Sequence, residues 1–231
     1  MKILTIDTST NVFSIALSQG TTLLAAHFDE IGKAASAKIP MYVETLLQTA
    51  GTNVRSIDAF AVTVGPGAFT GVRVGIAFVK GLALATGRPV IALSSLELLA
   101  MNAKGSDLPV CAMFDARKGE VYAAIYDLKS GMQLLRPESA IAPEKLLDEL
   151  KEPMLFIGDG ALRYREMIIE KLGTLAYFTA DDLNIPKASA GIPLAYTAFT
   201  SGNTTSPLEL QPRYHRLSEA EVAKKESCVI S

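Results

Sequence analysis

Apolar runs and short polar breaks divide the first hundred residues into alternating strands and helices. Three apolar runs separated by short polar turns predict three antiparallel neighbours, followed by a helix, a strand and a long helix. Pro40 is expected in the first turn of the first helix and Gly51 just after its end, and Ser94 with Glu97 forms a capping box for a later short helix. The predicted strands lie at residues 3–6, 13–18, 22–28, 59–64 and 89–93, and the longer helices at residues 39–50 and 69–86.

The same order of elements begins again near residue 109. The predicted strands of this second part lie at residues 110–114, 121–126, 132–135, 154–157 and 175–178, and the helices at 143–150, 161–172 and 189–200. Asp7 and Asp115 occupy equivalent places, each at the end of a first strand. We therefore predict an internal duplication, in which an α/β protein has two halves with mixed sheets. The halves cover residues 1–104 and 105–203, and an extended polar segment covers residues 204–231.

The helix predicted over residues 69–86 is apolar almost all round. Its only charges, Arg73 and Lys80, share one narrow face, so the helix must be covered on more than one side. A glycine inside a helix costs about 1 kcal/mol relative to alanine, which is tolerable where another backbone packs closely. Glycines recur every fourth residue around the start of this helix, as Gly67, Gly71 and Gly75.

We predict that this helix and the helix over residues 39–50 form a face that binds a partner. The glycine stripe would admit a neighbouring helix, so that two helices from each protein pack as a bundle. The alternative is a self-contained core in which loops of this chain cover the second apolar side. The candidate interface residues are Met41, Tyr42, Thr45, Gly71, Val74, Gly75, Phe78 and Leu82.

Composition and charge exclude several classes of protein. The chain has 231 residues, of which 49% are hydrophobic and 20% charged, and its formal net charge of −2 argues against a basic nucleic-acid surface. The only two cysteines, Cys111 and Cys228, are far apart, which suits a reducing compartment. The start of the chain lacks the features of a signal peptide, and charges and glycines interrupt the longest apolar runs. We expect a soluble cytoplasmic protein with no membrane segment.

Residues for metal or nucleophilic chemistry are scarce in this sequence. The two histidines, His27 and His215, are far apart and no cysteine pair exists, so no metal site is predicted. No Gly-x-Ser-x-Gly motif marks a nucleophile. Gly65, Gly67 and Gly71 fit a loose dinucleotide-binding pattern, but the next strand ends in two serines instead of the acidic residue that would bind a ribose.

Several motifs resemble one known family. The stretch from Gly65 to Arg73 resembles the signature Gly-Pro-Gly-Ser-Phe-Thr-Gly-Val-Arg of the bacterial tRNA threonylcarbamoyladenosine biosynthesis protein family TsaB, also called YeaZ, with Ala68 in place of the usual serine. Further similar segments lie at residues 1–9, 115–122, 158–160, 212–216 and 219–221. By the order of these segments along a chain of this length, the protein is identified as a member of that family.

The resemblance implies a fold and a function. The fold would be that of the actin, sugar-kinase and Hsp70 superfamily, with two ribonuclease-H-like halves. The protein would be a non-catalytic scaffold and activator of TsaD, which transfers threonylcarbamoyl from its adenylate to adenosine 37 of tRNA together with the ATPase TsaE. It would form a homodimer in isolation and a heterodimer with TsaD, and it would reach tRNA only through the complex. It would use no cofactor of its own, although ATP or ADP would act in the assembled complex.

Two departures accompany the resemblance. The His-x-x-x-His motif of TsaD has no counterpart within residues 94–100. Many family members carry a histidine just before the first helix, where this chain has Ala34, Ala35 and Ser36. The rival hypothesis is an autonomous enzyme, either an ATP-dependent small-molecule kinase of the same fold or a peptidase.

The nucleotide cleft of the superfamily has candidate counterparts in this chain. Its two aspartates would either hold magnesium through water or only cap tight turns. Bulky Arg117 and Lys118 stand where an active relative would carry a glycine and a hydroxyl, which favours the turn interpretation, and Asp159 is expected to cap the next helix. The residues of this degenerate cleft are Asp7, Thr8, Ser9, Asp115, Arg117, Gly158 and Gly160.

Overall fold

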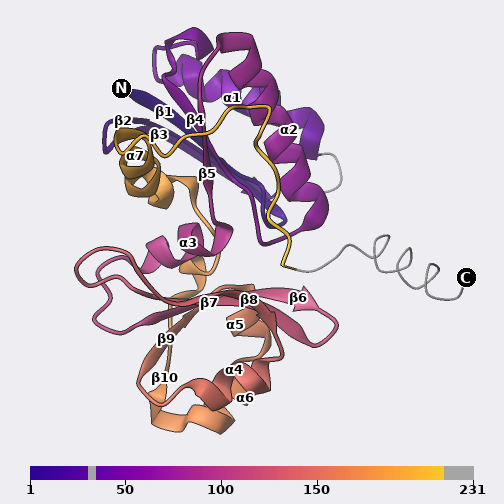
Figure 1. Ribbon diagram of the computed structural model, residues 1–231, viewed down its shortest axis with the longest axis vertical. Helices are drawn as coiled ribbons and strands as arrows, with labels where there is room; N and C mark the ends of the chain where they lie inside the picture. Colours follow the sequence, from indigo (N-terminus) through magenta and orange to yellow (C-terminus); the bar gives the residue numbers. More distant parts are fainter. Residues whose placement is uncertain (31–34, 216–231) are drawn as a thin grey trace, which may run out of the picture.

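The computed structural model describes residues 1–30 and 35–215 and consists of two halves, each built on a five-stranded mixed sheet (Figure 1). The strands of the first sheet are β1 (Lys2–Asp7), β2 (Val12–Gln19), β3 (Thr22–Glu30), β4 (Ala59–Thr63) and β5 (Val90–Leu93). Those of the second are β6 (Val110–Arg117), β7 (Glu120–Asp127), β8 (Gln133–Ile141), β9 (Met154–Ile157) and β10 (Ala176–Phe178).

The two sheets have the same topology. The first has the order β3-β2-β1-β4-β5 and the second the order β8-β7-β6-β9-β10. In both, the first three strands are antiparallel neighbours and the last two run parallel to the first. The prediction of a duplicated α/β fold with mixed sheets is therefore confirmed.

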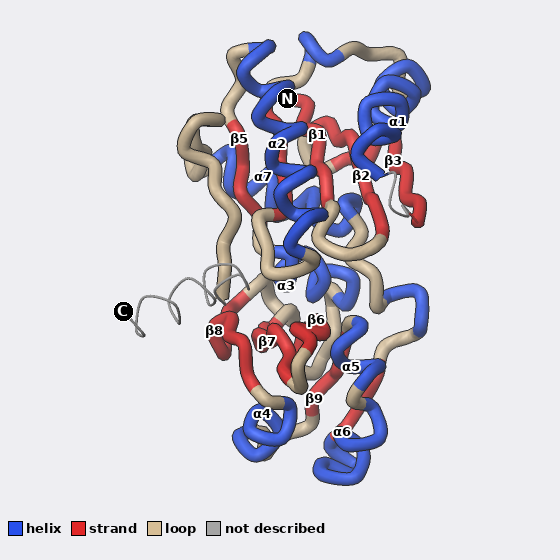
Figure 2. Tube along the Cα trace, turned by 90° about the vertical axis from the view of Figure 1, so that its right-hand side faces the viewer, coloured by secondary structure: helices blue, strands red, loops and turns tan. Residues whose placement is uncertain are grey.

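Helices cover both faces of the first sheet (Figures 1 and 2). One face packs against α1 (Ala35–Thr49) and α2 (Phe69–Thr86) in a core that includes Phe13, Phe60 and Val79. The other face carries alanines together with Ile3, Ile91 and Leu93, and it packs against the 3-10 turn Ala188–Gly191 and α7 (Ile192–Thr200).

The second sheet is covered by α3 on one face and by three helices on the other. The single helix is α3 (Ser95–Ala100), which continues into a 3-10 turn. The three helices on the opposite face are α4 (Pro143–Glu149), α5 (Asp159–Arg163) and α6 (Arg165–Leu172). Three further 3-10 turns lie at Val54–Ser56, Gly173–Leu175 and Asp181–Leu183.

The chain crosses between the halves more than once. A boundary at residue 104 separates the two sheets, but α3 precedes it and packs against β6 of the second half. In the other direction, α7 follows the second sheet and packs against β1 and β5 of the first. Residues 204–215 also return to the first half, where Thr205 pairs with Val90. A division into consecutive segments therefore separates α3 and α7 from the sheets on which they pack.

The longest helix, α2, has the bounds that its apolar pattern predicts. By length and composition alone it would suffice to cross a membrane, a test that core helices of soluble proteins also pass. Its buried residues Val72, Ile76 and Val79 face the sheet and belong to the core of the first half.

The predicted elements that differ from the structure include the first helix, the helix over residues 161–172 and the strand over residues 132–135. Helix α1 starts at Ala35, so Pro40 lies within the helix and not in its first turn. The helix predicted over residues 161–172 is divided at Tyr164, whose backbone amide bonds to the carbonyls of Gly160 and Leu162 and closes α5. Strand β8 continues through Pro137 because it is an edge strand, where a missing backbone donor costs little.

Candidate functional site

The turn that follows β1 holds a buried carboxyl group. Asp7 Oδ1 accepts hydrogen bonds from the Thr63 hydroxyl at 2.6 Å and from the Ser9 amide at 3.2 Å, whereas Oδ2 is buried without a partner. Burial raises the pKa of Asp7 to about 6, against the lowering effect of the hydrogen bonds. The buried Asp7 carboxyl therefore stabilises the turn by accepting hydrogen bonds from within the protein.

The same turn explains the glycine stripe of α2. A Cβ at Gly67 would overlap the Ser9 carbonyl, one at Gly71 the Thr8 carbonyl, and one at Gly75 the Thr8 hydroxyl. The Thr8 hydroxyl donates to the Gly71 carbonyl at 2.8 Å. The stripe is therefore filled by this chain's own turn, and the prediction that it admits a partner's helix at Gly71 and Gly75 is wrong.

The second hairpin engages its aspartate in ion pairs. Asp115 Oδ2 lies 3.1 Å from Nη1 of Arg117 and 3.2 Å from Nη1 of Arg163, and Oδ1 accepts the Arg117 amide at 3.0 Å. The loop residues Lys118 and Gly119 both have positive φ, as in a type I′ turn, and a bulge follows Asp115. These contacts favour the turn interpretation of Asp115. Strand β6 also extends to Arg117, so Asp115 does not close it.

The loop after β9 is packed tightly onto β6. A Cβ at Gly158 would overlap the Met113 carbonyl, and one at Gly160 would press on the backbone of Phe114. The Gly158 amide donates to Asn184 Oδ1 at 2.7 Å. Gly158, not Asp159, is the N-cap of α5, so that part of the prediction is wrong.

Asp159 accepts the Asp115 amide at 3.0 Å, and burial raises the pKa of the Asp159 carboxyl. In the first half, the Ser9 carbonyl accepts the Ala68 amide at 2.6 Å. The contacts of the predicted cleft residues thus stay within their own halves, those of Asp7, Thr8 and Ser9 in the first and those of Asp115, Arg117, Gly158 and Gly160 in the second. Asp7 Oδ2 and the Ser9 hydroxyl are buried without a partner.

The outer surface of α1 and α2 carries exposed apolar side chains, which on α1 lie among polar ones such as Glu44 and Gln48. Met41 is 54% exposed and Leu84 56%, and Thr45 is also exposed. A groove of ≈ 340 Å³ runs between the two helices, and Phe78 and Leu82 form one of its walls. The rest of its lining comes from Pro40, Val43, Glu44, Leu47, Gln48, Thr52, Asn53 and Val54.

Several candidate interface residues already contact other parts of this chain. Val74, Phe78 and Leu82 are half-buried against the core of the first half. Tyr42 donates its hydroxyl to Asp29 Oδ2 at 2.5 Å and stacks on His27 with ring centroids 4.4 Å apart, so its polar end is engaged by β3.

Sequence reasoning missed two parts of this face. Leu84 lies on the same side of α2 as the charged residues Arg73 and Lys80, so it was not counted with the apolar stripes. Residues four apart share a helix face, so its spacing from Lys80 already indicated that Leu84 is exposed. The groove residue Leu47 was missed because it is buried at 5% exposure and belongs equally to the core.

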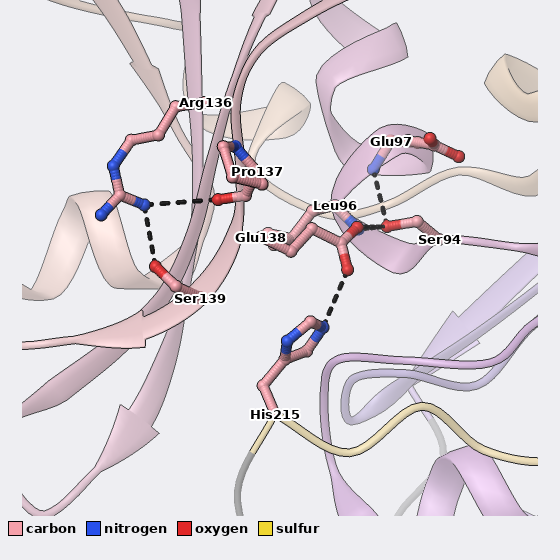
Figure 3. A network of polar contacts seen from close by, with 8 residues as sticks. All are labelled: Ser94, Leu96, Glu97, Arg136, Pro137, Glu138, Ser139 and His215. Atoms are coloured by element: carbon pink, nitrogen blue, oxygen red, sulfur yellow. Dashed lines mark hydrogen bonds and ion pairs between the residues drawn. The ribbon is translucent and has the colours of Figure 1, made fainter.

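A buried polar network joins the halves (Figure 3). Glu138 of β8 accepts from the Ser94 hydroxyl with one oxygen and lies 2.9 Å from His215 Nε2 with the other. Ser94 caps α3 by accepting the amides of Leu96 and Glu97. Burial, and then the charge of Glu138, raise the pKa of the Glu97 carboxyl.

Within residues 1–30 and 35–215 no group of three or more His, Cys, Asp or Glu side chains is placed to hold a metal ion. Ala34, where many family members carry a histidine, and the segment at residues 219–221 lie outside the described residues.

Comparisons with known proteins agree with these features. A protein-family model described as TsaD, tRNA N6-adenosine threonylcarbamoyltransferase, matches residues 29–224. A Bacillus subtilis (strain 168) protein named tRNA threonylcarbamoyladenosine biosynthesis protein TsaB is 33% identical, covering 98% of this chain and 99% of that protein.

Solved structures give the same result. A Pseudomonas aeruginosa protein described as similar to peptidase YeaZ superposes with a TM-score of 0.83 at 33% identity, covering 93% of this chain and 99% of that one. A ROK hexokinase from Thermus thermophilus, at 13% identity and a TM-score of 0.50 over 85% of this chain and 99% of that one, shares the fold alone. The fold is that of the actin-like and sugar-kinase superfamily. By its full-length similarity, this chain belongs to the TsaB family of tRNA threonylcarbamoyladenosine biosynthesis proteins.

Proposed function

We propose that this chain is the non-catalytic subunit that binds and activates TsaD during the synthesis of threonylcarbamoyladenosine in tRNA. The observation that carries the proposal is the apolar groove between α1 and α2, lined by Phe78 and Leu82, together with the exposed Met41 on α1 and the exposed Leu84 on α2. Exposed apolar surface of this kind marks protein-interaction sites.

The identity of the proposed partner rests on similarity between the two proteins. A family model of TsaD matches residues 29–224, a range that includes both helices of this face. A homologous partner would present a corresponding pair of helices, so this face would pair with its counterpart in TsaD or in a second copy of this chain. We therefore propose a homodimer in isolation that exchanges for a heterodimer with TsaD.

The remaining parts of the complex follow from the same proposal. TsaD would perform the transfer, TsaE would join the assembly, and ATP or ADP would act there. This chain would need no cofactor of its own and would meet tRNA only through the complex, in the cytoplasm. Its formal net charge of −2 supports an indirect contact with tRNA, because direct binding to phosphates requires basic surface.

The proposal is tested by placing charges on the exposed face. Met41→Asp combined with Leu84→Asp should give a folded protein that elutes as a monomer in size-exclusion chromatography with light scattering. It should not bind TsaD in calorimetry and should not support tRNA modification in a reconstituted reaction. Both side chains are more than half exposed, so the fold should tolerate the change.

Leu134→Asp with Leu135→Asp is the matched control, since these leucines of β8 are 53% and 49% exposed and lie in the other half. This control should dimerise, bind TsaD and support modification. If the Met41 and Leu84 variant binds TsaD as well as the control does, the helical face is not the interface. Turnover of ATP with a sugar or a peptide by the purified chain alone would favour the rival hypothesis.

A further inference from the structure

The C-terminal segment over residues 204–215, here called the strap, contacts both halves. Figure 1 shows it in yellow, descending from the first half toward the second sheet. It begins beside the edge strand β5, where Thr205 exchanges two backbone hydrogen bonds with Val90, of 3.0 and 2.8 Å. Leu210 then enters the core of the first half and is only 2% exposed.

Past Leu210 the strap lies along the loop that starts α2. The Arg213 amide donates to the Val64 carbonyl at 2.8 Å, and a Cβ at Gly65 would press on the Arg213 carbonyl. This close approach gives Gly65, with a φ of +109°, a second reason to be glycine. The strap therefore contacts the Gly-Pro-Gly loop at Gly65, whereas the turn after β1 contacts it at Gly67.

The next residue of the strap joins the first turn of α2. The Tyr214 ring stacks on Phe69 with centroids 5.3 Å apart, and Arg73 Nε donates to the Tyr214 hydroxyl at 2.6 Å. The Arg73 guanidinium also lies 3.7 Å from the centroid of the Phe69 ring. These three side chains form one stacked cluster on the first half.

The last described residue of the strap reaches the second half. His215 Nε2 lies 2.9 Å from Glu138 Oε2 (Figure 3). The centroid of the His215 ring is 6.3 Å from that of the Tyr122 ring. Glu138 is only 14% exposed and also accepts the Ser94 hydroxyl at the N-cap of α3. Two consecutive residues, Tyr214 and His215, thus bind different halves.

We propose that the strap fixes the angle between the two halves, so that they move as one rigid body. Halves joined by a limited interface are expected to move relative to one another unless something restrains them. The contact of α3 with the turn Ala188–Gly191 joins the halves at one place. The strap adds a second connection at another place, from Phe69 and Arg73 of α2 to Glu138 of β8. Two connections at different places restrain rotation about either one. The motif Pro212–His215 is then a clamp between the halves.

The test measures the distance between the halves directly. Spin labels are placed at Arg55→Cys, in the exposed turn of the first half, and at Glu170→Cys on α6, in a chain that also carries Cys228→Ser. Cys111 is fully buried, and burial raises the pKa of its thiol to about 12, so it does not react with the label. The distances are measured by double electron–electron resonance. Excess unlabelled protein is added so that a dimer contains at most one labelled chain and only distances within one chain are recorded.

The unaltered strap should give one narrow distance distribution. Tyr214→Ala with His215→Ala removes the side-chain contacts to both halves and should broaden or shift it. Tyr177→Ala is the matched control, because this tyrosine is 48% exposed against 42% for Tyr214 and lies away from the strap on β10. The control should leave the distribution unchanged. An unchanged, narrow distribution in the double variant overturns the proposal.

A milder variant covers the case in which the double variant does not fold. His215→Ala alone removes one half-buried side chain and keeps the Tyr214 cluster, and it should still broaden the distribution. In hydrogen exchange, loss of the pair with Glu138 should make the Arg213 amide exchange about five- to tenfold faster. If the Arg213 amide of the His215→Ala variant is as protected as in the unaltered protein, and the distance distribution is also unchanged, the clamp is refuted. Neither readout depends on TsaD, so failure here is distinguishable from failure of the proposed function.

Discussion

Replacement of Asp7 by Asn should change how the stability of the protein depends on pH. The carboxyl of Asp7 is fully buried, and its pKa rises from 3.8 to about 6 on folding. Below about pH 4 both the folded and the unfolded chain carry the proton. Between about pH 4 and pH 6 the unfolded chain releases it while the folded chain retains it, so rising pH favours unfolding.

The size of the effect follows from the two pKa values. Each pKa unit corresponds to about 1.4 kcal/mol, so the unfolding free energy should fall by about 3 kcal/mol between pH 3.5 and pH 7 on account of Asp7 alone. Asp7→Asn cannot ionise and keeps an oxygen to accept from Thr63 and Ser9. The unfolding free energy of the Asn variant minus that of the unaltered protein should therefore increase as the pH rises from 3.5 to 7.

Urea unfolding followed by circular dichroism at half-unit steps of pH gives the difference directly. All other titrating groups are common to both proteins and cancel in the comparison. Thr63→Val provides a second arm, because the Thr63 hydroxyl lowers the pKa of Asp7, and its loss should extend the window to higher pH. A constant difference between the two proteins, or one that changes in the opposite direction, would show that the Asp7 carboxyl is solvated and that the buried turn described here is incorrect.

Four other substitutions test the packing of the fold and the role of Asp115. Gly71→Ala should lower the unfolding free energy by about 1–3 kcal/mol in urea unfolding, because the added Cβ meets the Thr8 carbonyl. Gly81→Ala on the same helix adds a Cβ that meets no other atom, so this variant should raise the unfolding free energy by up to about 1 kcal/mol. Asp115→Asn should leave assembly and tRNA modification intact and cost at most about 1 kcal/mol, and loss of modification with the fold preserved would restore a nucleotide role for this residue. Leu210→Ala should cost about 2–5 kcal/mol in thermal or urea unfolding, and a loss near zero would mean that the strap is not part of the core.

Local periodicity predicts most of the elements because each is fixed by residues close to it in sequence. Helix α2 and strand β9 have the predicted bounds, since an apolar pattern with glycine or polar residues at its ends needs no other information. The duplication followed from two copies of one pattern. The break at Tyr164 was not predictable in this way, because the apolar spacing continues through it and only the backbone turns.

Contacts between distant segments account for the parts of the site that sequence could not supply. The pairing of His215 with Glu138 joins residues that no periodicity relates. The sequence therefore placed His215 only in a segment similar to the family, far from the other histidine.

The glycine stripe illustrates the limit most clearly. Glycines at every fourth position correctly predicted that a backbone approaches α2 closely, because nothing else offsets their cost in a helix. The pattern could not say whose backbone approaches, and here it is the Thr8 turn of the same chain. The assignment matters for experiment: a large residue at Gly75 would displace Thr8 and disturb the fold, so lost binding in such a variant would say nothing about a partner. A charge at Leu84 tests the interface without that ambiguity, because the side chain that it replaces is 56% exposed.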